Sequence, residues 1–225
     1  MQGKSSVNQS LSIGGKLLLL LLNLTPLVQI ACCVAVWIFP VVEPLWGRVG
    51  VFLFLLYVVP ALLGRLFKLG CARCERSAVG GKAFFFWWAS MQSQMLFARL
   101  PMLEEVLRLI PGLYSFWLRL WGSQIGRLTF WSPGTVILDR GFLSIGDDVV
   151  LGAGVRFNPH VIRKNDHGEL ELQLSPVQLG DRVSIGGYSL LTAGTVIPDD
   201  ETTRAYLLSP PFSEWKEGRR IKRSD

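Results

Sequence analysis

The chain has 225 residues, of which 50% are hydrophobic and only 18% are charged, and its formal net charge is +6. An average soluble domain has about a quarter of its residues charged, so this composition argues against an ordinary soluble protein. The apolar residues are concentrated in the first hundred positions, whereas glycine, aspartate and arginine are frequent in the second hundred. We therefore expect a membrane part followed by a globular part.

Two apolar stretches near the N-terminus are candidates for membrane spans. Residues 17–39 form an uncharged run of 23 residues, about 34 Å as a helix, and the hydrocarbon core of a bilayer is roughly 30 Å thick. The run 49–64 has only 16 uncharged residues and contains a proline, so it spans only if Arg48 and Arg65 extend to the headgroups; a re-entrant segment is the alternative. We expect a hairpin of two transmembrane helices in residues 1–67. A signal peptide is disfavoured because no convincing cleavage site follows the first run.

Basic residues beside these runs predict the orientation. Lys4 and Lys16 precede the first run, the connecting loop contains Arg48 and Glu43, and five basic residues follow the second run: Arg65, Lys68, Arg73, Arg76 and Lys82. Both termini are therefore expected on the cytoplasmic side of an inner membrane, together with the globular part. Because these charges lie beside the membrane runs and not in a folded module with interleaved aromatics, we expect no nucleic-acid partner.

The four cysteines form two close pairs, Cys32 with Cys33 in the first run and Cys71 with Cys74 in the sequence CARC. One CxxC supplies half of a zinc site, and neither a second pair nor a suitably spaced histidine follows. We expect reduced structural thiols and no bound metal.

Residues 68–124 connect the membrane runs to the globular part. Five consecutive aromatics, Phe84 to Trp88, lie near basic residues, a composition that suits the headgroup layer. Further on, helical spacing places four apolar residues on one face and three charged residues opposite: Leu103, Val106, Leu107 and Ile110 against Glu104, Glu105 and Arg108. An ordinary amphipathic helix packed on the next domain is the alternative. We expect interfacial helices that also support the globular part.

From Ile125 the chain repeats every six residues, beginning IGRLTF, WSPGTV and ILDRGF and ending LGDRVS, IGGYSL, LTAGTV and IPDDET. The first position is apolar in all ten hexads, and the fifth is small or β-branched in nine. A fixed short period indicates a solenoid. Three hexads make one triangular turn, in which the first positions point inward and stack, and glycine at several second positions permits tight corners.

The hexads resemble the hexapeptide-repeat family, whose members are mostly acyltransferases. The resemblance covers residues 125–210, and IGDDVVLGAGVRF with PVQLGDRVSIGGYSLLTAGTVI is similar to the sugar acetyltransferase branch. It implies N-terminal helices followed by an all-β left-handed parallel β-helix, an exception to right-handed crossovers, with an extruded loop at 163–178 and a basic tail at 211–225. It also implies acyl-coenzyme A as co-substrate and a homotrimer with each site between two subunits. The helical first hundred residues depart from that branch and are closer to a membrane-bound group.

Both histidines lie in the segment FNPHVIRKNDHG. His160 is the fourth residue of FNPHVI, an outward-facing corner position two residues before the regular coil ends, and His167 lies within the loop. In the resembled enzymes a histidine at this junction is the general base, so the resemblance assigns that role to His160. Gly187 in IGGY matches the family position whose amide faces the thioester carbonyl. The chemistry agrees, because a positioned imidazole accelerates proton transfer about 10²–10⁴-fold and backbone N–H groups stabilise an oxyanion. His167 is interpreted as a loop residue or an acceptor contact.

Other polar residues near the junction complete the candidate site. Asp139 and Asp166 are alternatives for orienting the imidazole and are also candidate substrate-binding residues, as is Asn158. The basic tail EWKEGRRIKR could bind the phosphates of coenzyme A, but an anionic membrane is favoured.

These features predict a membrane-anchored acyltransferase that moves an acyl group from acyl-coenzyme A to a hydroxyl, or less favourably an amine, of a lipid or lipid-linked acceptor. A soluble acceptor would need no membrane anchor. The alternative is a non-catalytic β-helix that acts as a scaffold or binding subunit of a membrane biosynthetic complex. A zinc carbonic anhydrase of the β-helical type is disfavoured, since it needs three histidine ligands and the chain has two histidines.

Overall fold

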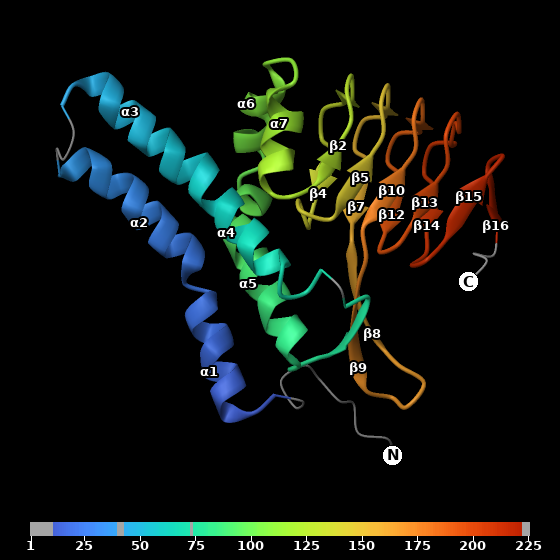
Figure 1. The fold of residues 1–225 in the computed structure, drawn as a ribbon, viewed down its shortest axis with the longest axis horizontal. Helices are drawn as coiled ribbons and strands as arrows, with labels where there is room; N and C mark the ends of the chain where they lie inside the picture. Colours follow the sequence, from blue (N-terminus) through green and yellow to red (C-terminus); the bar gives the residue numbers. More distant parts are fainter. Residues whose placement is uncertain (1–10, 40–42, 73, 222–225) are drawn as a thin grey trace.

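The structure, a computed structural model, describes residues 11–39, 43–72 and 74–221 (Figure 1). Four basic residues used above to predict orientation and tail binding, Lys4, Arg73, Lys222 and Arg223, lie outside the described residues. The described chain has a helical part up to residue 120 and, from residue 124 onward, a stack of short strands beside it.

Two rods of helix form a hairpin, and both are long and apolar enough to cross a bilayer: Ile13–Ile38 with 26 residues and Leu45–Lys68 with 24 residues. The second rod is longer than the predicted run 49–64, because the arginines near its two ends are also helical. The first rod is interrupted at Asn23 and Leu24, and the second contains a π-helical turn. The elements are α1 (Ile13–Leu22), α2 (Thr25–Ile38), α3 (Leu45–Leu53), η2 (Phe54–Val58) and α4 (Val59–Lys68).

The π-helical turn has a simple cause. Pro60 has no N–H, so it leaves the carbonyl of Leu56 without its usual helical partner. Gln29 of α2 donates from Nε2 to that carbonyl at 3.0 Å, and Trp117 donates from Nε1 to the carbonyl of Tyr57 at 2.9 Å. These two side chains satisfy the turn and also join the second rod to the first and to α7.

Helix α5 (Lys82–Arg99) lies between the hairpin and the strands and packs most extensively against α4 (Figure 1). The prediction that Phe84–Trp88 face the headgroup layer is wrong for Phe84 and Trp87, which are 0% and 1% exposed. Both belong to a hydrophobic core that α5 builds with residues of the later strands, among them Leu172 and Leu174. Contacts with a distant part of the chain therefore decide which way these aromatics face.

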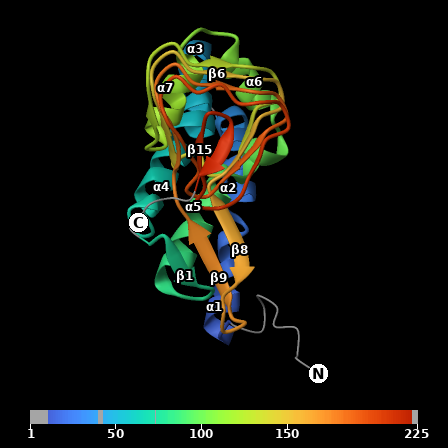
Figure 2. The same cartoon turned by 90° about the vertical axis from the view of Figure 1, so that its right-hand side faces the viewer.

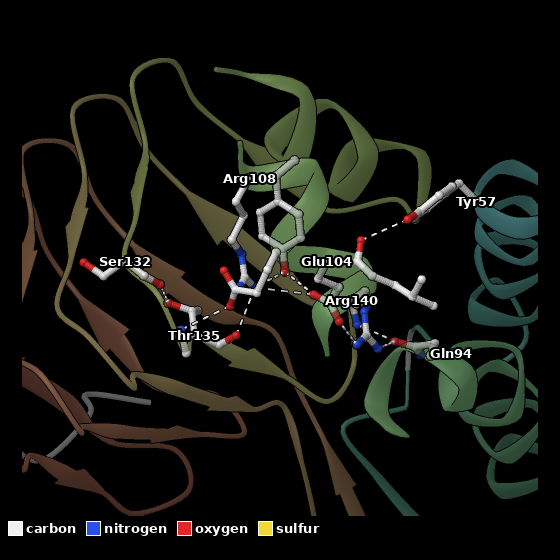
Figure 3. Close-up of polar contacts among 11 residues, drawn as sticks. Tyr57, Gln94, Glu104, Arg108, Ser132, Thr135 and Arg140 are labelled. Atoms are coloured by element: carbon white, nitrogen blue, oxygen red, sulfur yellow. Dashed lines mark hydrogen bonds and ion pairs between the residues drawn. The ribbon is translucent and has the colours of Figure 1, made fainter. Parts of the chain in front are cut away.

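Helices α6 (Met102–Arg108) and α7 (Leu113–Leu120) close the helical part. The face predicted for α6 is largely reversed: Glu104 is only 4% exposed, whereas Val106 and Ile110 are 54% and 57% exposed. The charged side packs inward because Glu104 forms ion pairs with Arg108 and with Arg140 of the strand region (Figure 3). Leu107 is buried, as predicted.

The strands form three parallel faces that share one core, with successive strands passing from face to face (Figures 1 and 2). One face contains β2 (Gln124–Ile125), β5 (Leu143–Ile145), β10 (Val177–Leu179), β13 (Val196–Ile197) and β15 (Glu214–Lys216), with β16 (Arg219–Ile221) antiparallel at its edge. The second contains β3 (Phe130–Trp131), β6 (Val150–Leu151) and β11 (Ser184–Ile185). The third contains β4 (Val136–Ile137), β7 (Arg156–Asn158), β12 (Leu190–Thr192) and β14 (Leu208–Ser209).

The first hexad positions stack inward, as predicted. Ile125, Ile145, Leu179 and Ile197 pair in consecutive turns of the first face, and each is at most 6% exposed. Trp131 alone among the ten first positions is only half-buried. The three-sided parallel coil is thus present, and its left hand stays a prediction.

The excursion from the coil is an antiparallel hairpin of β8 (His160–Lys164) and β9 (Leu170–Leu174), with β1 (Arg76–Ala78) pairing as a third strand. The predicted loop 163–178 therefore begins too late: His160 is the first residue of the hairpin and not a corner of the coil. The chain leaves the coil early because Val161 and Ile162 pair with Gln173 and Leu172.

Candidate active site

The junction of coil and hairpin brings a carboxylate to His160. Ile137 pairs with Phe157 on the third face, so Asp139 lies one turn of the coil away from Pro159 and beside His160. Nδ1 of His160 is 2.5 Å from Oδ2 of Asp139. The Asp139 side chain is 1% exposed and the His160 side chain 15% exposed, so the pair is nearly enclosed.

Helix α5 supplies a third member of this arrangement. Trp87 donates from Nε1 to Oδ1 of Asp139 at 2.9 Å, and its ring centroid lies 4.8 Å from that of His160. Both carboxylate oxygens of Asp139 therefore have a partner, which fixes the plane of the carboxylate. In the part of the chain that the structure describes, Nε2 of His160 makes no hydrogen bond.

These contacts set the proton affinity of the imidazole. Burial lowers the pKa of His160, but the charge of Asp139 and the hydrogen bond to it outweigh burial, so the pKa is raised above its ordinary value. With its proton on Nδ1 donated to Asp139, neutral His160 presents the lone pair of Nε2 outward. This is the tautomer that a general base needs, and an adjacent carboxylate stabilises the imidazolium that forms.

The residue after Asp139 is held by the same helix. Arg140 is 1% exposed, and its main-chain N–H and guanidinium donate to Oε1 of Gln94 at 2.8 Å and 3.2 Å (Figure 3). Trp87 and Gln94 are seven residues apart and so lie on one face of α5. This face holds Asp139 and Arg140 together, and neither α5 residue was anticipated from the sequence.

Two of the other candidates lie at different distances from the pair. Asn158 is on β7, two residues before His160, and its Oδ1 is buried without a hydrogen-bond partner among the described residues. Asp166 and His167 are exposed at the tip of the hairpin, about 16 Å along β8 from His160 by the rise of a strand. Asp139, and not Asp166, is therefore the carboxylate that contacts the imidazole.

Gly187 is not brought to His160 within one chain. It lies three residues before the start of β12. His160 lies two residues after Asn158 of β7, which pairs with Thr192 at the opposite end of β12. About six residues of extended chain, roughly 20 Å, separate these positions. A site that uses both residues would therefore need a second copy of the chain.

The two cysteines of CARC differ in their surroundings. Cys71 is 1% exposed, and burial raises the pKa of its thiol to about 12, so it stays protonated at neutral pH. Cys74 is exposed. The described residues contain no group of three or more histidine, cysteine or acidic side chains arranged to hold a metal ion.

No protein-family model matches the chain, and no curated protein matches it. Three solved structures resemble 56–57% of it: a maltose O-acetyltransferase from Clostridium difficile 630 (17% identity, 86% of that chain, TM-score 0.37), a galactoside acetyltransferase in complex with coenzyme A (14%, 81%, 0.36) and a hexapeptide-repeat acetyltransferase from Vibrio cholerae (14%, 90%, 0.31). The chain is similar to hexapeptide-repeat acetyltransferases. At these TM-scores the similarity does not decide an activity, which has to come from the chain's own residues.

Proposed function

We propose that this protein is a membrane-anchored acyltransferase that transfers an acyl group from acyl-coenzyme A to a hydroxyl of a lipid or lipid-linked acceptor, with His160 as the general base. The observation that supports this most directly is the buried chain of contacts from Trp87 through Asp139 to His160. A histidine that merely fills a loop has no need of a carboxylate held on both oxygens, and an oriented carboxylate–imidazole pair is typical of acyl transfer.

In the proposed reaction, Nε2 of His160 removes the proton of the acceptor hydroxyl, whose oxygen attacks the thioester carbonyl. The tetrahedral intermediate then expels the thiolate of coenzyme A, which receives the proton from the imidazolium. The products are an ester and free coenzyme A. Asn158, whose buried Oδ1 has no partner among the described residues, would accept a hydrogen bond from a different polar group of the acceptor.

We further propose a homotrimer of left-handed coils in which the N–H of Gly187 from a neighbouring copy stabilises the oxyanion. The separation of Gly187 from His160 within one chain favours this arrangement over a site inside one subunit. Closed three-fold symmetry would form three equivalent sites.

A lipid acceptor and a membrane location suit the surroundings of His160. The imidazole contacts Trp87, and the backbone of His160 pairs with Leu174 across the hairpin; Trp87 and Leu174 both belong to the core that α5 builds. The two apolar rods pack directly on α5, so an anchored protein would bring its site to the leaflet. Because the proposed donor, acyl-coenzyme A, is cytosolic, we expect the site on the cytoplasmic side of the membrane. Lys68 is one of the basic residues that predict the orientation. Its Nζ donates to the carbonyls of Gly122 and Gly141, so we do not expect it to contact lipid headgroups.

The test compares the wild type with His160→Ala and His167→Ala, the latter as a matched control at the other histidine. Each purified protein receives acetyl- or long-chain acyl-coenzyme A with a lipid extract, and thiol release is followed. We expect acceptor-dependent release that falls at least about 10²-fold in His160→Ala and is unchanged in His167→Ala. No release from the folded wild type with any donor would favour the scaffold instead, and release that survives in His160→Ala would remove the assigned base.

A further inference from the structure

The outside of the coil changes character from one turn to the next at one corner. Strand pairing aligns Leu128 with Asp148, Arg182 and Asp200 in successive turns. Leu128 is 81% exposed, and the side chains of Arg182 and Asp200 are 55% and 66% exposed. The backbone φ of Leu128 is +54°, a region that an L residue occupies at a cost of roughly 1 kcal/mol. Only the first turn presents an apolar side chain here.

The adjacent face shows the same trend. Phe130 on β3 aligns with Val150, then with Ser184, then with Thr202. Phe130 is 60% exposed and Val150 is 47% exposed. This face therefore becomes polar with distance from the helical part.

The neighbouring helices have their charged side inside and their apolar side outside. Glu104 and Arg108 pair with each other beneath α6, whereas five large apolar side chains of this region are more than half exposed: Met102, Val106, Leu109, Ile110 and Phe116. A helix packed on a domain in water has the opposite arrangement. A contiguous exposed apolar surface of this kind marks an interaction site.

Three arginines lie between these apolar surfaces. A cavity of about 510 Å³ is lined by Ile110, Leu128 and Phe130 together with Arg119 and Arg127. Arg127 forms an ion pair with Asp147. Arg119 donates to the main-chain carbonyls of Ile125 and Gly126, and among the described residues it forms no salt bridge, although its charge acts on the nearby Asp147. Arg108 lines the same cavity with its side chain 7% exposed and its Nε unpaired.

We infer that the first turn of the coil and the α6–α7 turn are immersed in the leaflet that holds the helical hairpin, with Arg119 at the phosphates of anionic phospholipids. This leaflet-facing surface consists of Leu109, Ile110, Phe116, Leu128 and Phe130, and its assignment rests on the proposed membrane anchoring. Figures 1 and 2 both place α6 and α7 toward the same end of the molecule as α3. Helix α7 also contacts η2 and α4, so this region lies directly beside the hairpin.

The change in polarity from one turn to the next favours lipid, and not a second copy of the chain, as the partner that covers this surface. A subunit interface along the coil would cover the equivalent positions of every turn, so later turns would also be apolar. At this corner and on this face, the apolar character is instead limited to the turns beside the helices, as expected where a bilayer edge crosses the coil. The exposed Tyr188, Tyr206 and Leu208 of later turns lie at another corner and on the third face. Cationic side chains beside such a surface bind anionic headgroups.

The test measures which side chains contact lipid. Cys32, Cys33, Cys71 and Cys74 are replaced by alanine, and single nitroxide labels are attached at Leu128, at Asp200 (the matched corner of a later turn) and at Leu27 of α2, which is 62% exposed. The full chain is reconstituted into phosphatidylcholine vesicles with or without phosphatidylglycerol. Collision rates with oxygen, which partitions into lipid, and with a water-soluble nickel chelate are compared.

We expect the label at 128 to resemble the label at 27, with oxygen collisions favoured severalfold, and the label at 200 to favour the nickel chelate. Phosphatidylglycerol should deepen the label at 128, and Arg119→Gln should abolish that difference; an equal effect from soluble glycerol phosphate would instead indicate a free-ion site and overturn the headgroup assignment. A water-exposed label at 128 beside a lipid-exposed label at 27 would overturn the inference alone. A label at 128 shielded from both reagents would indicate a protein contact and overturn it as well, whereas a water-exposed label at 27 would overturn the anchoring itself.

Discussion

The two ring nitrogens of His160 have different surroundings, and this difference determines the chemistry open to the residue. Nδ1 faces Asp139, which is itself held by Trp87, whereas Nε2 makes no hydrogen bond to a described residue. An imidazole without the carboxylate would be free to adopt either tautomer. The contact therefore selects the tautomer that presents a base to an acceptor hydroxyl.

The raised pKa of His160 predicts a pH dependence. Because the base acts in its neutral form, activity should rise with pH through a pKa above the ordinary histidine value. In Asp139→Asn the raising charge is lost while burial still lowers the pKa, so the acid limb of the profile should move to lower pH. The maximal rate should fall by about 10²-fold or more, since the amide does not enforce the same tautomer.

The measurement is initial rate against pH for the wild type and Asp139→Asn, with Asp166→Asn as the control on the exposed hairpin tip. An unshifted acid limb in Asp139→Asn would contradict the assigned role of Asp139. A shift in Asp166→Asn would show that the loop carboxylate acts instead.

At the scale of elements, α5 connects the membrane-like hairpin to the site. Its buried face carries Trp87 and Gln94, which hold Asp139 and Arg140, and its other sides pack on α4, α2 and α1. The orientation of the carboxylate therefore depends on a helix that lies outside the repeat.

This dependence makes Trp87 a positioning residue with a matched control. Trp87→Phe keeps a ring beside His160 but removes the N–H that binds Asp139, so we expect about a 10-fold lower kcat with little change in KM for the donor. Trp88→Phe removes an equivalent indole bond, from Nε1 to Oδ1 of Asn23 at 3.0 Å, and should leave kcat unchanged.

Imidazole NMR titration gives a second measure, since the chain has only two histidines to assign. The pKa of His160 should fall in Trp87→Phe, because a mobile carboxylate raises it less, and should be unchanged in Trp88→Phe. Equal losses of rate in both variants would indicate damage to packing and not to positioning.

At the scale of the whole molecule, the proposed trimer takes the base from one chain and Gly187 from a second copy. This predicts complementation between two inactive variants. His160→Ala and Gly187→Pro, which has no N–H, should each be inactive, and trimers that contain both should recover a fraction of wild-type activity.

Recovery is measured after co-expression with two affinity tags, so that only mixed assemblies are assayed, and each variant's unfolding temperature and mass are checked alone. Mixed assemblies with no activity, from variants that fold and assemble, would contradict a site shared between subunits. Full activity in Gly187→Pro alone would remove the assigned oxyanion donor.

The sequence by itself determined the three-sided coil and, to within three residues, the place where the coil is interrupted. A period of six is local information: each first position, such as Ile145 or Leu151, needs only to be apolar to stack inward. The two apolar rods could be predicted in the same way, because the apolar composition of each rod is also local information. His160 was identified as a candidate because it stands where the repeat stops.

Only the tertiary structure decided which residues surround His160 and which side of each helix is buried. Asp139 reaches the imidazole from 21 residues earlier and Trp87 reaches Asp139 from 52 residues earlier, and no local pattern specifies such a contact. Glu104 of α6 is buried because it forms an ion pair with Arg140 of the coil. The amphipathic pattern of α6 therefore predicted the wrong buried face. The hydrophobic period depends on residues that are close in the sequence. The burial of a charged side chain depends instead on a partner that folding brings from a distant part of the chain.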